Sequence, residues 1–263
     1  MTVAGWLGRR VIHLDECDST NDEAARLARA GAEHGTVVIA GSQRAGRGRD
    51  GRAWLSPPGL GLYLSAVVRP MLPLPLVPPM SLAIGVGVCE AAREAGADAR
   101  LKWPNDVLAA GRKLAGVLVE AQSQGGRLEA VVVGIGVDLG GELPPELAAR
   151  AITLAAAAGR GIDPAAFTAA LLRHVERWID RYVAAGLPPV IAAWHERMAP
   201  RLAVRAVIDG TPLEGEAAGL DEGGALLVRD AAGRLHPVRS GDVDVIRVIA
   251  PPAPGPESAP GPC

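Results

Sequence analysis

The chain of 263 residues is 49% hydrophobic, which is enough apolar sequence for one large domain, alone or with a small second domain. Its formal net charge of −2 argues against a general nucleic-acid binder, because such proteins are usually basic overall. Cys17, Cys89 and Cys263 are odd in number and far apart, which fits neither a metal site nor a disulfide framework and favours a reducing cytoplasm.

The first predicted elements are two strands separated by a helix. A strand over residues 10–14 leads into a helix over 24–30, which Thr20 and Glu23 introduce with the spacing of a capping box. The β-branched run over 36–40 predicts the next strand, because such side chains pack well on a pleated surface.

A loop rich in glycine and arginine follows, in the run Gly46-Arg47-Gly48-Arg49-Asp50-Gly51-Arg52-Ala53-Trp54. Glycines let a backbone wrap closely round a ligand, and guanidinium groups pair bidentately with phosphate or carboxylate. The run therefore predicts a mobile loop that closes over a small anionic ligand. A solvated basic surface loop is the alternative that the run alone leaves open.

The same loop contains a G-x-G-x-x-G pattern, formed by Gly46, Gly48 and Gly51. A dinucleotide-binding fingerprint requires a helix to begin at the third glycine. Residues 52–59 contain Pro57 and cannot begin a helix, so the pattern does not indicate a dinucleotide site. The sequence also has no Walker A motif, which argues against a P-loop nucleotide hydrolase.

The next segment predicts a strand over 62–68 and a helix over 81–95 that ends at Gly96. The most apolar window, residues 70–88, is interrupted by five prolines in its first half, so we expect no membrane-spanning helix.

A second unusual run, Lys102-Trp103-Pro104-Asn105-Asp106, comes after an extended segment over 100–102. It places a cation, an amide and a carboxylate on one tight turn. A lysine can neutralise phosphate charge, and the Asn and Asp oxygens can hold Mg²⁺ directly or through water. An ordinary turn with a polar tip remains the alternative for this run taken alone.

A hairpin is predicted from 107–108, a turn at Gly111 and a strand over 114–120. Lys113 lies just beyond the turn, at the edge of an apolar strand. Lys113 is a candidate ligand-binding cation, and an exposed lysine that protects a strand edge from aggregation is the alternative.

The second half begins with a strand over 128–135, and helices dominate residues 145–198. One helix opens at Asp163 and Pro164, because Asp suits the N-cap and Pro suits the first helical position.

After Pro200 the pattern changes to short strands and turns, which predicts a small five-stranded β barrel with a boundary near 199–203. Residues 251–263 form a tail of Pro, Ala and Gly that we expect to be disordered. The predicted strands of the small module are 204–208, 213–218, 225–228 and 243–248.

No side-chain nucleophile is indicated, because the five histidines do not cluster and no Ser/His or Cys/His arrangement is evident. The remaining chemistry is one in which positive groups position a polyphosphate and neutralise charge as it builds.

Taken together, the two runs resemble the motifs of biotin–protein ligases over roughly residues 11–249. Several independent motifs occur in the order and spacing typical of that family. They are Ser19-Thr20-Asn21, the run 46–54, Ser56-Pro57-x-Gly59, the run 102–106, Lys113-Leu114-Ala115-Gly116 and Ile152-Thr153-Leu154.

The resemblance implies an α+β fold, with a class II synthetase-like mixed sheet flanked by helices and a small C-terminal SH3-like β barrel. It implies a catalytic biotin- and ATP-binding domain over 1–200, the β domain over 201–250 and the tail over 251–263. About ten residues precede the first strand, too few for a helix-turn-helix, so we expect no DNA-binding repressor role.

The resemblance also implies a reaction. Biotin and MgATP would give biotinoyl-5′-AMP and pyrophosphate, and a lysine of a biotin carboxyl carrier domain would then attack the mixed anhydride. We therefore expect biotin, ATP and Mg²⁺ as small-molecule partners and a carrier domain of a biotin-dependent carboxylase as the protein partner. We also expect a cytoplasmic protein that is a monomer or a weak homodimer. No nucleic-acid or membrane partner is expected.

The family roles, carried over residue by residue, make Lys113, Lys102, Asp106 and Arg49 the catalytic candidates. Lys113 would bind the biotin carboxyl and the α-phosphate side, and the 46–54 loop would close over biotin and the adenylate. The implied metal ligands are Asn105, Asp106 and Asp138. The implied biotin and ATP contacts are Ser19, Thr20, Asn21, Gln43, Gly46, Arg47, Gly48, Arg49, Arg52, Trp54, Asn105, Lys113 and Gly116.

Asp138 departs from the family pattern, since an Asn is usual at this position, and an Asp there predicts altered metal binding or nucleotide affinity. Two other functions stay open at this point. One is a lipoate or octanoate ligase of related fold, which Trp54 and the glycine–arginine loop disfavour. The other is a binding protein that has lost turnover, which the presence of both Lys102 and Lys113 disfavours.

Overall fold

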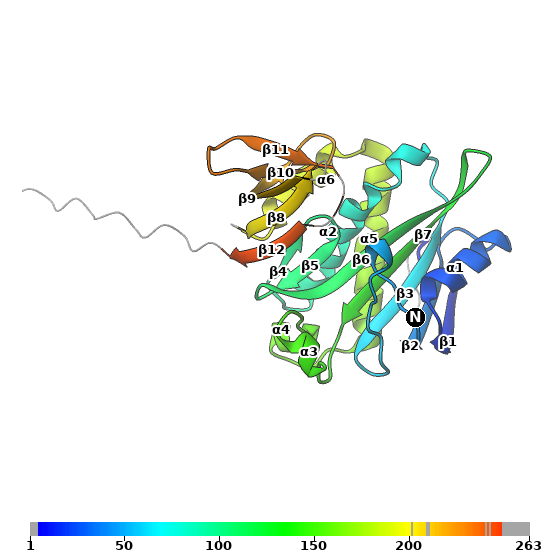
Figure 1. The fold of residues 1–263 in the computed structure, drawn as a ribbon. Coiled ribbons are helices and arrows are strands. Elements are labelled where there is room, and N and C mark those ends of the chain that lie inside the picture. Colours follow the sequence, from blue (N-terminus) through cyan, green and yellow to red (C-terminus); the bar gives the residue numbers. More distant parts are fainter. Residues whose placement is uncertain (1–4, 201, 209–210, 240, 242, 249–263) are drawn as a thin grey trace, which may run out of the picture.

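A computed structural model describes residues 5–200, 202–208, 211–239, 241 and 243–248. The tail predicted to be disordered, residues 251–263, lies outside the described residues. The large domain contains a seven-stranded mixed sheet in the order β1-β2-β3-β7-β6-β5-β4 (Figure 1). Only β1 and β2 pair in parallel among these strands. The strands are β1 Val11–Cys17, β2 Thr36–Gln43, β3 Gly61–Val68, β4 Ala99–Lys102, β5 Asp106–Ala109, β6 Arg112–Gln124 and β7 Arg127–Asp138.

Both faces of the sheet are covered at its central strand β7, and the alternation of side chains along β7 shows how. Val131, Val133 and Ile135 join the core on the side of helix α2, whereas Ala130 and Val132 pack with helix α1 on the other side. Because successive side chains of a strand point to opposite faces, a strand buried on both sides is an unbroken apolar run.

The helices frame this sheet. α1 packs on β3 and β7, and α2 packs on β4, β5 and β6, with α5 and α6 behind it. Short 3₁₀ turns lie at η1 Arg49–Gly51 and η2 Leu74–Leu76. The helices are α1 Thr20–Arg29, α2 Met80–Glu94, α3 Pro145–Ala148, α4 Leu154–Ala158, α5 Pro164–Ala185 and α6 Pro188–Arg197.

The predicted start of α1 is wrong. The helix begins at Thr20, with Ser19 in the N-cap position and no side-chain capping bond, so Thr20 and Glu23 form no capping box. The reason is a competing partner: the Thr20 hydroxyl donates to the side chain of Gln43 on β2 instead of capping its own helix. In α5 the predicted cap is confirmed, because the Asp163 side chain accepts from two backbone N–H groups.

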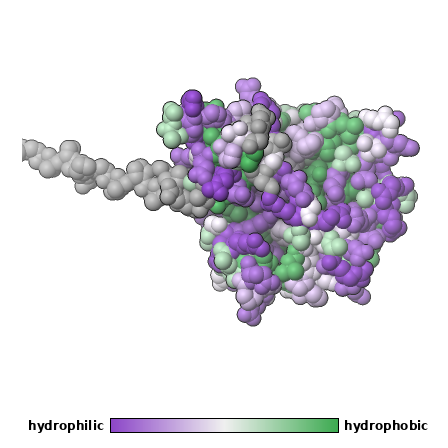
Figure 2. Space-filling view, viewed as in Figure 1, coloured by the Kyte–Doolittle hydropathy of each residue, from purple (hydrophilic) through white to green (hydrophobic). Residues whose placement is uncertain are grey.

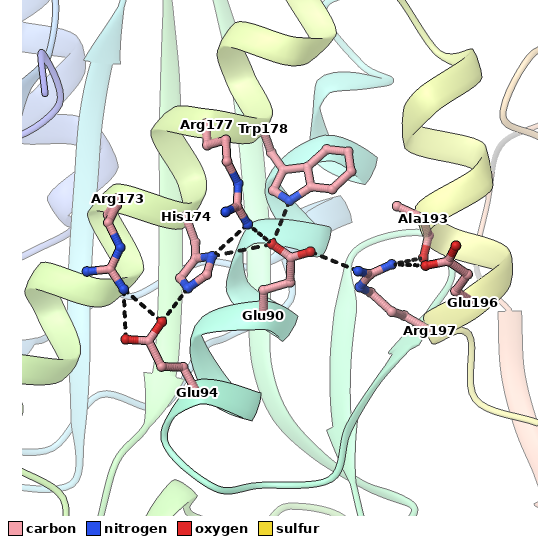
Figure 3. A network of polar contacts seen from close by, with 9 residues as sticks. All are labelled: Glu90, Glu94, Arg173, His174, Arg177, Trp178, Ala193, Glu196 and Arg197. Atoms are coloured by element: carbon pink, nitrogen blue, oxygen red, sulfur yellow. Dashed lines mark hydrogen bonds and ion pairs between the residues drawn. The ribbon is translucent and has the colours of Figure 1, made fainter.

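An ion-pair network centred on the largely buried Glu90 joins α2, α5 and α6 (Figure 3). Glu90 of α2 accepts from Arg177 and, at 2.8 Å, from Trp178 Nε1 of α5. Arg197 of α6 donates to the other Glu90 oxygen at 2.9 Å. A charged side chain is buried here because three donors surround it.

The C-terminal residues form an antiparallel five-stranded sheet in the order β11-β10-β9-β8-β12. The mixed α+β fold with a small C-terminal β domain is therefore confirmed. The Trp103 indole N–H donates to the Gly224 carbonyl at 3.0 Å and ties this sheet to the large domain. The strands are β8 Leu202–Ile208, β9 Thr211–Leu220, β10 Leu226–Arg229, β11 Leu235–Val238 and β12 Val243–Val248.

Among the described residues, one helical stretch, Leu74–Glu94, is long and apolar enough to cross a membrane by length and composition alone. It lies mostly inside the fold, with 61% of its most apolar window buried, which is also the property of a core helix. On the face drawn in Figure 2, hydrophilic residues surround smaller hydrophobic groups, consistent with the placement of most apolar side chains in the core.

Candidate functional site

The glycine–arginine loop folds as a short hairpin rather than an open loop. The Trp54 N–H donates to the Gly46 carbonyl at 2.8 Å, and the Gly48 N–H donates to the Arg52 carbonyl at 2.7 Å. The tip contains η1, in which Asp50 and Gly51 have φ angles of 54° and 72°. Glycine adopts this left-handed conformation without strain, which suits it to the tip.

A buried polar cluster lies at the N-terminus of α1, beside the base of this hairpin. The Thr20 N–H and hydroxyl donate to Gln43 Oε1 at 2.8 and 3.1 Å. The Gln43 amide donates to Ser56 Oγ at 2.8 Å, and Ser65 Oγ lies 2.7 Å from Thr20 Oγ1. Ser19 is 2% exposed and stands next to this cluster in the chain. The structure therefore brings Ser19 and Thr20 together with Gln43, as predicted for residues that contact one ligand.

Asn21 extends the cluster toward the centre of the sheet. Its Oδ1 lies 2.6 Å from Ser65 Oγ, and its Nδ2 donates to Glu120 Oε2 at 2.5 Å. A Cβ on Gly134 would lie 2.2 Å from Asn21 Oδ1, so only glycine leaves room for the amide. Ser65 and Glu120 were missed by the sequence analysis, although a lone hydroxyl in the apolar run 62–68 was a usable signal.

The Trp54 indole lies against the glycines of β6 and β7. A Cβ on Gly136 would be 2.5 Å from the Trp54 ring, and one on Gly116 would be 3.2 Å from it. The Trp54 Nε1–H is buried and has no hydrogen-bond partner among the described residues. Lys113 Nζ lies 5.1 Å from the indole centroid, a cation–π distance. These groups form one wall with an apolar plane and a cation.

Lys102 and Lys113 share one carboxylate. Lys113 Nζ is 2.6 Å from Asp106 Oδ1, and Lys102 Nζ is 3.1 Å from Asp106 Oδ2. Burial works to raise the pKa of Asp106, but the two lysines outweigh it and lower the pKa below its usual range. Two ammonium groups with one carboxylate leave a net positive charge, which suits an anionic ligand.

Asp106, one of the three predicted metal ligands, is already engaged by the two lysines. Both Asp106 oxygens already face ammonium groups, so Asp106 does not fit a metal-ligand role here. Asn105 Nδ2 donates to the Val117 carbonyl at 2.6 Å, which ties the 102–106 turn to β6. The described residues hold no group of three or more His, Cys, Asp or Glu side chains suited to a metal ion.

Asp138, at the end of β7, is the other carboxylate of this region. It is 6% exposed, and burial raises its pKa to about 7 against the opposing effect of Lys113. It is therefore a carboxyl group that can be neutral or charged near neutral pH, next to the lysine predicted to bind the reacting groups.

The arginines of the hairpin have partners that the sequence did not indicate. Arg47 pairs with Asp22 of α1, and Arg49 Nη2 lies 3.4 Å from the Gly241 carbonyl of the C-terminal domain. Arg52 is exposed at the hairpin. Arg47, predicted to contact a ligand, is thus bound to a carboxylate of its own chain.

Comparisons with known proteins fit this geometry. Residues 15–138 match the Biotin/lipoate A/B protein ligase family, and residues 203–245 match the Biotin protein ligase C terminal domain. The chain is similar to the Bifunctional ligase/repressor BirA of Bacillus subtilis, at 34% identity over 91% of this chain and 75% of the relative. It is also similar to the Biotin--[acetyl-CoA-carboxylase] ligase of Paracoccus denitrificans, at 36% identity over 84% of this chain and 95% of the relative.

A solved structure also resembles it. The Biotin protein ligase from Aquifex aeolicus in complex with biotin and ATP superimposes with a TM-score of 0.79, at 29% identity. The match covers 91% of this chain and 99% of that one.

Proposed function

The chain belongs to the biotin protein ligase family, and from this premise we propose that it attaches biotin to one lysine of a biotin carboxyl carrier domain. The chain is a ligase that uses biotin and ATP. The carrier, the residue roles and the requirement for Mg²⁺ are parts of the proposal. The observation that carries it is the pair Lys102 and Lys113 on Asp106, beside the Trp54 wall.

In the first step, a biotin carboxylate oxygen attacks the α-phosphorus of ATP, and the bond to pyrophosphate breaks. Two anions must approach each other, so cations at the reacting centre lower the barrier. Lys113 supplies this charge, because its side chain is 36% exposed and also lies against the Trp54 ring. Lys102, at 18% exposure, adds positive charge from the opposite side of Asp106.

In the second step, the neutral amine of the carrier lysine attacks the acyl carbon of biotinoyl-5′-AMP. The bond from this carbon to the phosphate oxygen breaks, AMP leaves, and the amine nitrogen loses one proton to water as the amide forms. Asp106 accepts from Lys102 and Lys113 and so fixes both ammonium groups relative to the 102–106 turn. Arg49, at the hairpin tip, completes the proposed catalytic set by closing over the adenylate and excluding water.

The biotin ring system occupies the region of Ser19, Thr20 and Gln43, whose amide and hydroxyl groups match a ureido group in hydrogen-bonding character. Asn21, Gly46, Gly48, Gly116 and Trp54 line the same region. Mg²⁺ enters with ATP as part of the substrate. The proposed protein contacts of Mg²⁺ are the Asp138 carboxylate and the side-chain oxygen of Asn105, because both Asp106 oxygens already face lysine ammonium groups.

The domain limits stay as proposed, with a catalytic domain over 1–200 and a β domain over 201–250. We also propose a monomer or weak homodimer and no nucleic-acid partner. Support comes from the net charge of −2 and from Arg44 and Arg47, whose guanidinium groups pair with carboxylates of the same chain. A cytoplasmic location stays a prediction of the sequence.

The direct test is the intact mass of a purified apo carrier domain after incubation with this protein, biotin and MgATP. We expect a gain of one biotinyl group that depends on ATP. A gain with lipoate but not biotin would replace this function by that of a lipoate ligase. No gain with either substrate, together with binding of biotin, would contradict the proposed transfer.

A further inference from the structure

Arg47 is bound by a carboxylate that lies outside its own loop. Its Nη1 donates to Asp22 Oδ2 at 2.6 Å, and its Nη2 donates to Asp22 Oδ1 at 2.7 Å. Two parallel hydrogen bonds between a guanidinium and a carboxylate fix the relative orientation of both groups. The hydrogen bond from Arg47 lowers the pKa of Asp22 below its usual value.

This ion pair joins two parts of the proposed site that are 25 residues apart in the sequence. Asp22 lies in the first turn of α1, whose N-terminal residues form the buried polar cluster. Arg47 lies in the hairpin, where a backbone bridge pairs it with Ala53. The pair therefore connects the hairpin that covers the site to the helix that forms its floor.

A second carboxylate continues the connection inward. Glu120 Oε1 is 3.9 Å from Arg47 Nη2, and the other Glu120 oxygen accepts from Asn21 at 2.5 Å. Because Asn21 also contacts Ser65, a chain of polar contacts runs from the hairpin arginine to the residues that we propose for the biotin ring.

We propose that Asp22 is a positioning residue that holds Arg47 and thereby keeps the 46–54 hairpin closed over the bound acyl-adenylate. This inference rests on the proposed function. A mixed anhydride is lost to water when it leaves a covered site, so the time that the hairpin stays closed sets the fraction of adenylate that reaches the carrier.

Both partners are partly exposed, at 53% for Asp22 and 36% for Arg47, so the pair contributes little to global stability. It acts instead on a local opening equilibrium of the hairpin. Removing an exposed pair of this kind shifts such an equilibrium by about two- to fivefold.

The test is the rate at which biotinoyl-adenylate leaves the protein. Wild type and Asp22→Asn are loaded with labelled biotin and MgATP without carrier, and release is followed after a chase with unlabelled biotin. We expect Asp22→Asn to release adenylate about two- to fivefold faster. The rate of adenylate formation, measured as pyrophosphate release in a single turnover, should change less than the release rate.

The chain offers a matched control and a rescue variant. Asp18 accepts from Arg44 at 2.8 Å in another exposed ion pair next to the hairpin, so Asp18→Asn should keep the wild-type release rate. Asp22→Glu retains the carboxylate and should recover most of the wild-type rate. Equal release rates for Asp22→Asn and wild type would overturn the inference. Failure of wild type to form adenylate would instead overturn the proposed function on which it rests.

Discussion

Lys113 lies between Asp106 and Trp54, with its ammonium 2.6 Å from the Asp106 carboxylate and 5.1 Å from the indole centroid. The carboxylate fixes the position of the cation, and the indole shields one side of it from water. A cation held in this way needs little reorganisation when negative charge develops beside it, which is the condition for strong electrostatic catalysis.

Removal of this cation should therefore impair the first chemical step. We expect Lys113→Ala to lower the rate of biotin-dependent pyrophosphate release by about 100-fold or more. Lys113→Arg keeps the charge and should be less impaired, although its planar group fits the position of an ammonium poorly. Unchanged adenylation in Lys113→Ala would contradict the role that we assign to this residue.

The space that Gly136 leaves for the Trp54 ring should be essential for activity but not for folding. In Gly136→Ala the new methyl would lie 2.5 Å from the indole, so the ring and its hairpin must shift. We expect kcat/KM for biotin to fall about tenfold or more, because a misplacement of this size disturbs the geometry of bound groups. Gly140→Ala is the control, since its Cβ would lie 3.9 Å from Ala155 Cβ in ordinary contact. Equal losses in both variants would remove the special role of the Trp54 contact.

Most strands and the two functional motifs were accessible from sequence because their signals are local. Apolar runs predict β3 over 62–68 and β7 over 128–135, and the structure extends β7 to Asp138. The ion pair of Arg47 with Asp22 was not accessible from residue patterns, and the hydrogen bond of Thr20 with Gln43 was implied only by the family resemblance, because each pair comes together only when α1 folds onto the sheet. Contacts of this kind depend on tertiary packing, not on propensity.

Two other omissions have similar causes. Glu120 lies on β6, where a charged residue in a strand is typical of a solvated face, yet it accepts from the buried Asn21. The strand β11, Leu235–Val238, was missed because Pro237 interrupts its short apolar pattern. A solvated strand face explains the local pattern around Glu120, and a loop explains the local pattern around Pro237.

Asp138 should make stability depend on pH. Burial raises its folded-state pKa from 3.8 to about 7, so the native protein keeps a proton that the unfolded chain has already lost. The native state is therefore progressively destabilised as pH rises between these two values, and the effect is complete above the folded-state pKa. Asp138→Asn, which resembles the neutral acid at every pH, should exceed wild type in Tm by a margin that grows across this range.

The measurement is thermal unfolding of both proteins at about pH 5 and about pH 8. Asp98→Asn provides a control, because the Asp98 side chain is 78% exposed and should show the same Tm as wild type at both pH values. A Tm difference for Asp138→Asn that stays constant with pH would show that its carboxyl does not titrate in this range.

Glu90 should be the most costly ion-pair partner to remove on the helical side of the molecule. Its side chain is 14% exposed and accepts from Arg177, Trp178 and Arg197, as Figure 3 shows. In Glu90→Gln the amide oxygen can still accept from one donor, but Arg177 and the largely buried Arg197 both lose the charge of Glu90, and Arg197 keeps only its contact with the exposed Glu196. We expect a loss of about 1–3 kcal/mol in the free energy of unfolding by urea.

Glu94 provides the matched comparison on the same helix. It pairs with Arg173 and His174 on α5, but its side chain is 49% exposed, so water can replace much of what the variant loses. Glu94→Gln should therefore cost less than about 1 kcal/mol. If both variants lose the same free energy of unfolding, burial does not determine how much Glu90 contributes to stability. If Glu90→Gln unfolds like wild type, the network of Figure 3 does not hold the three helices together.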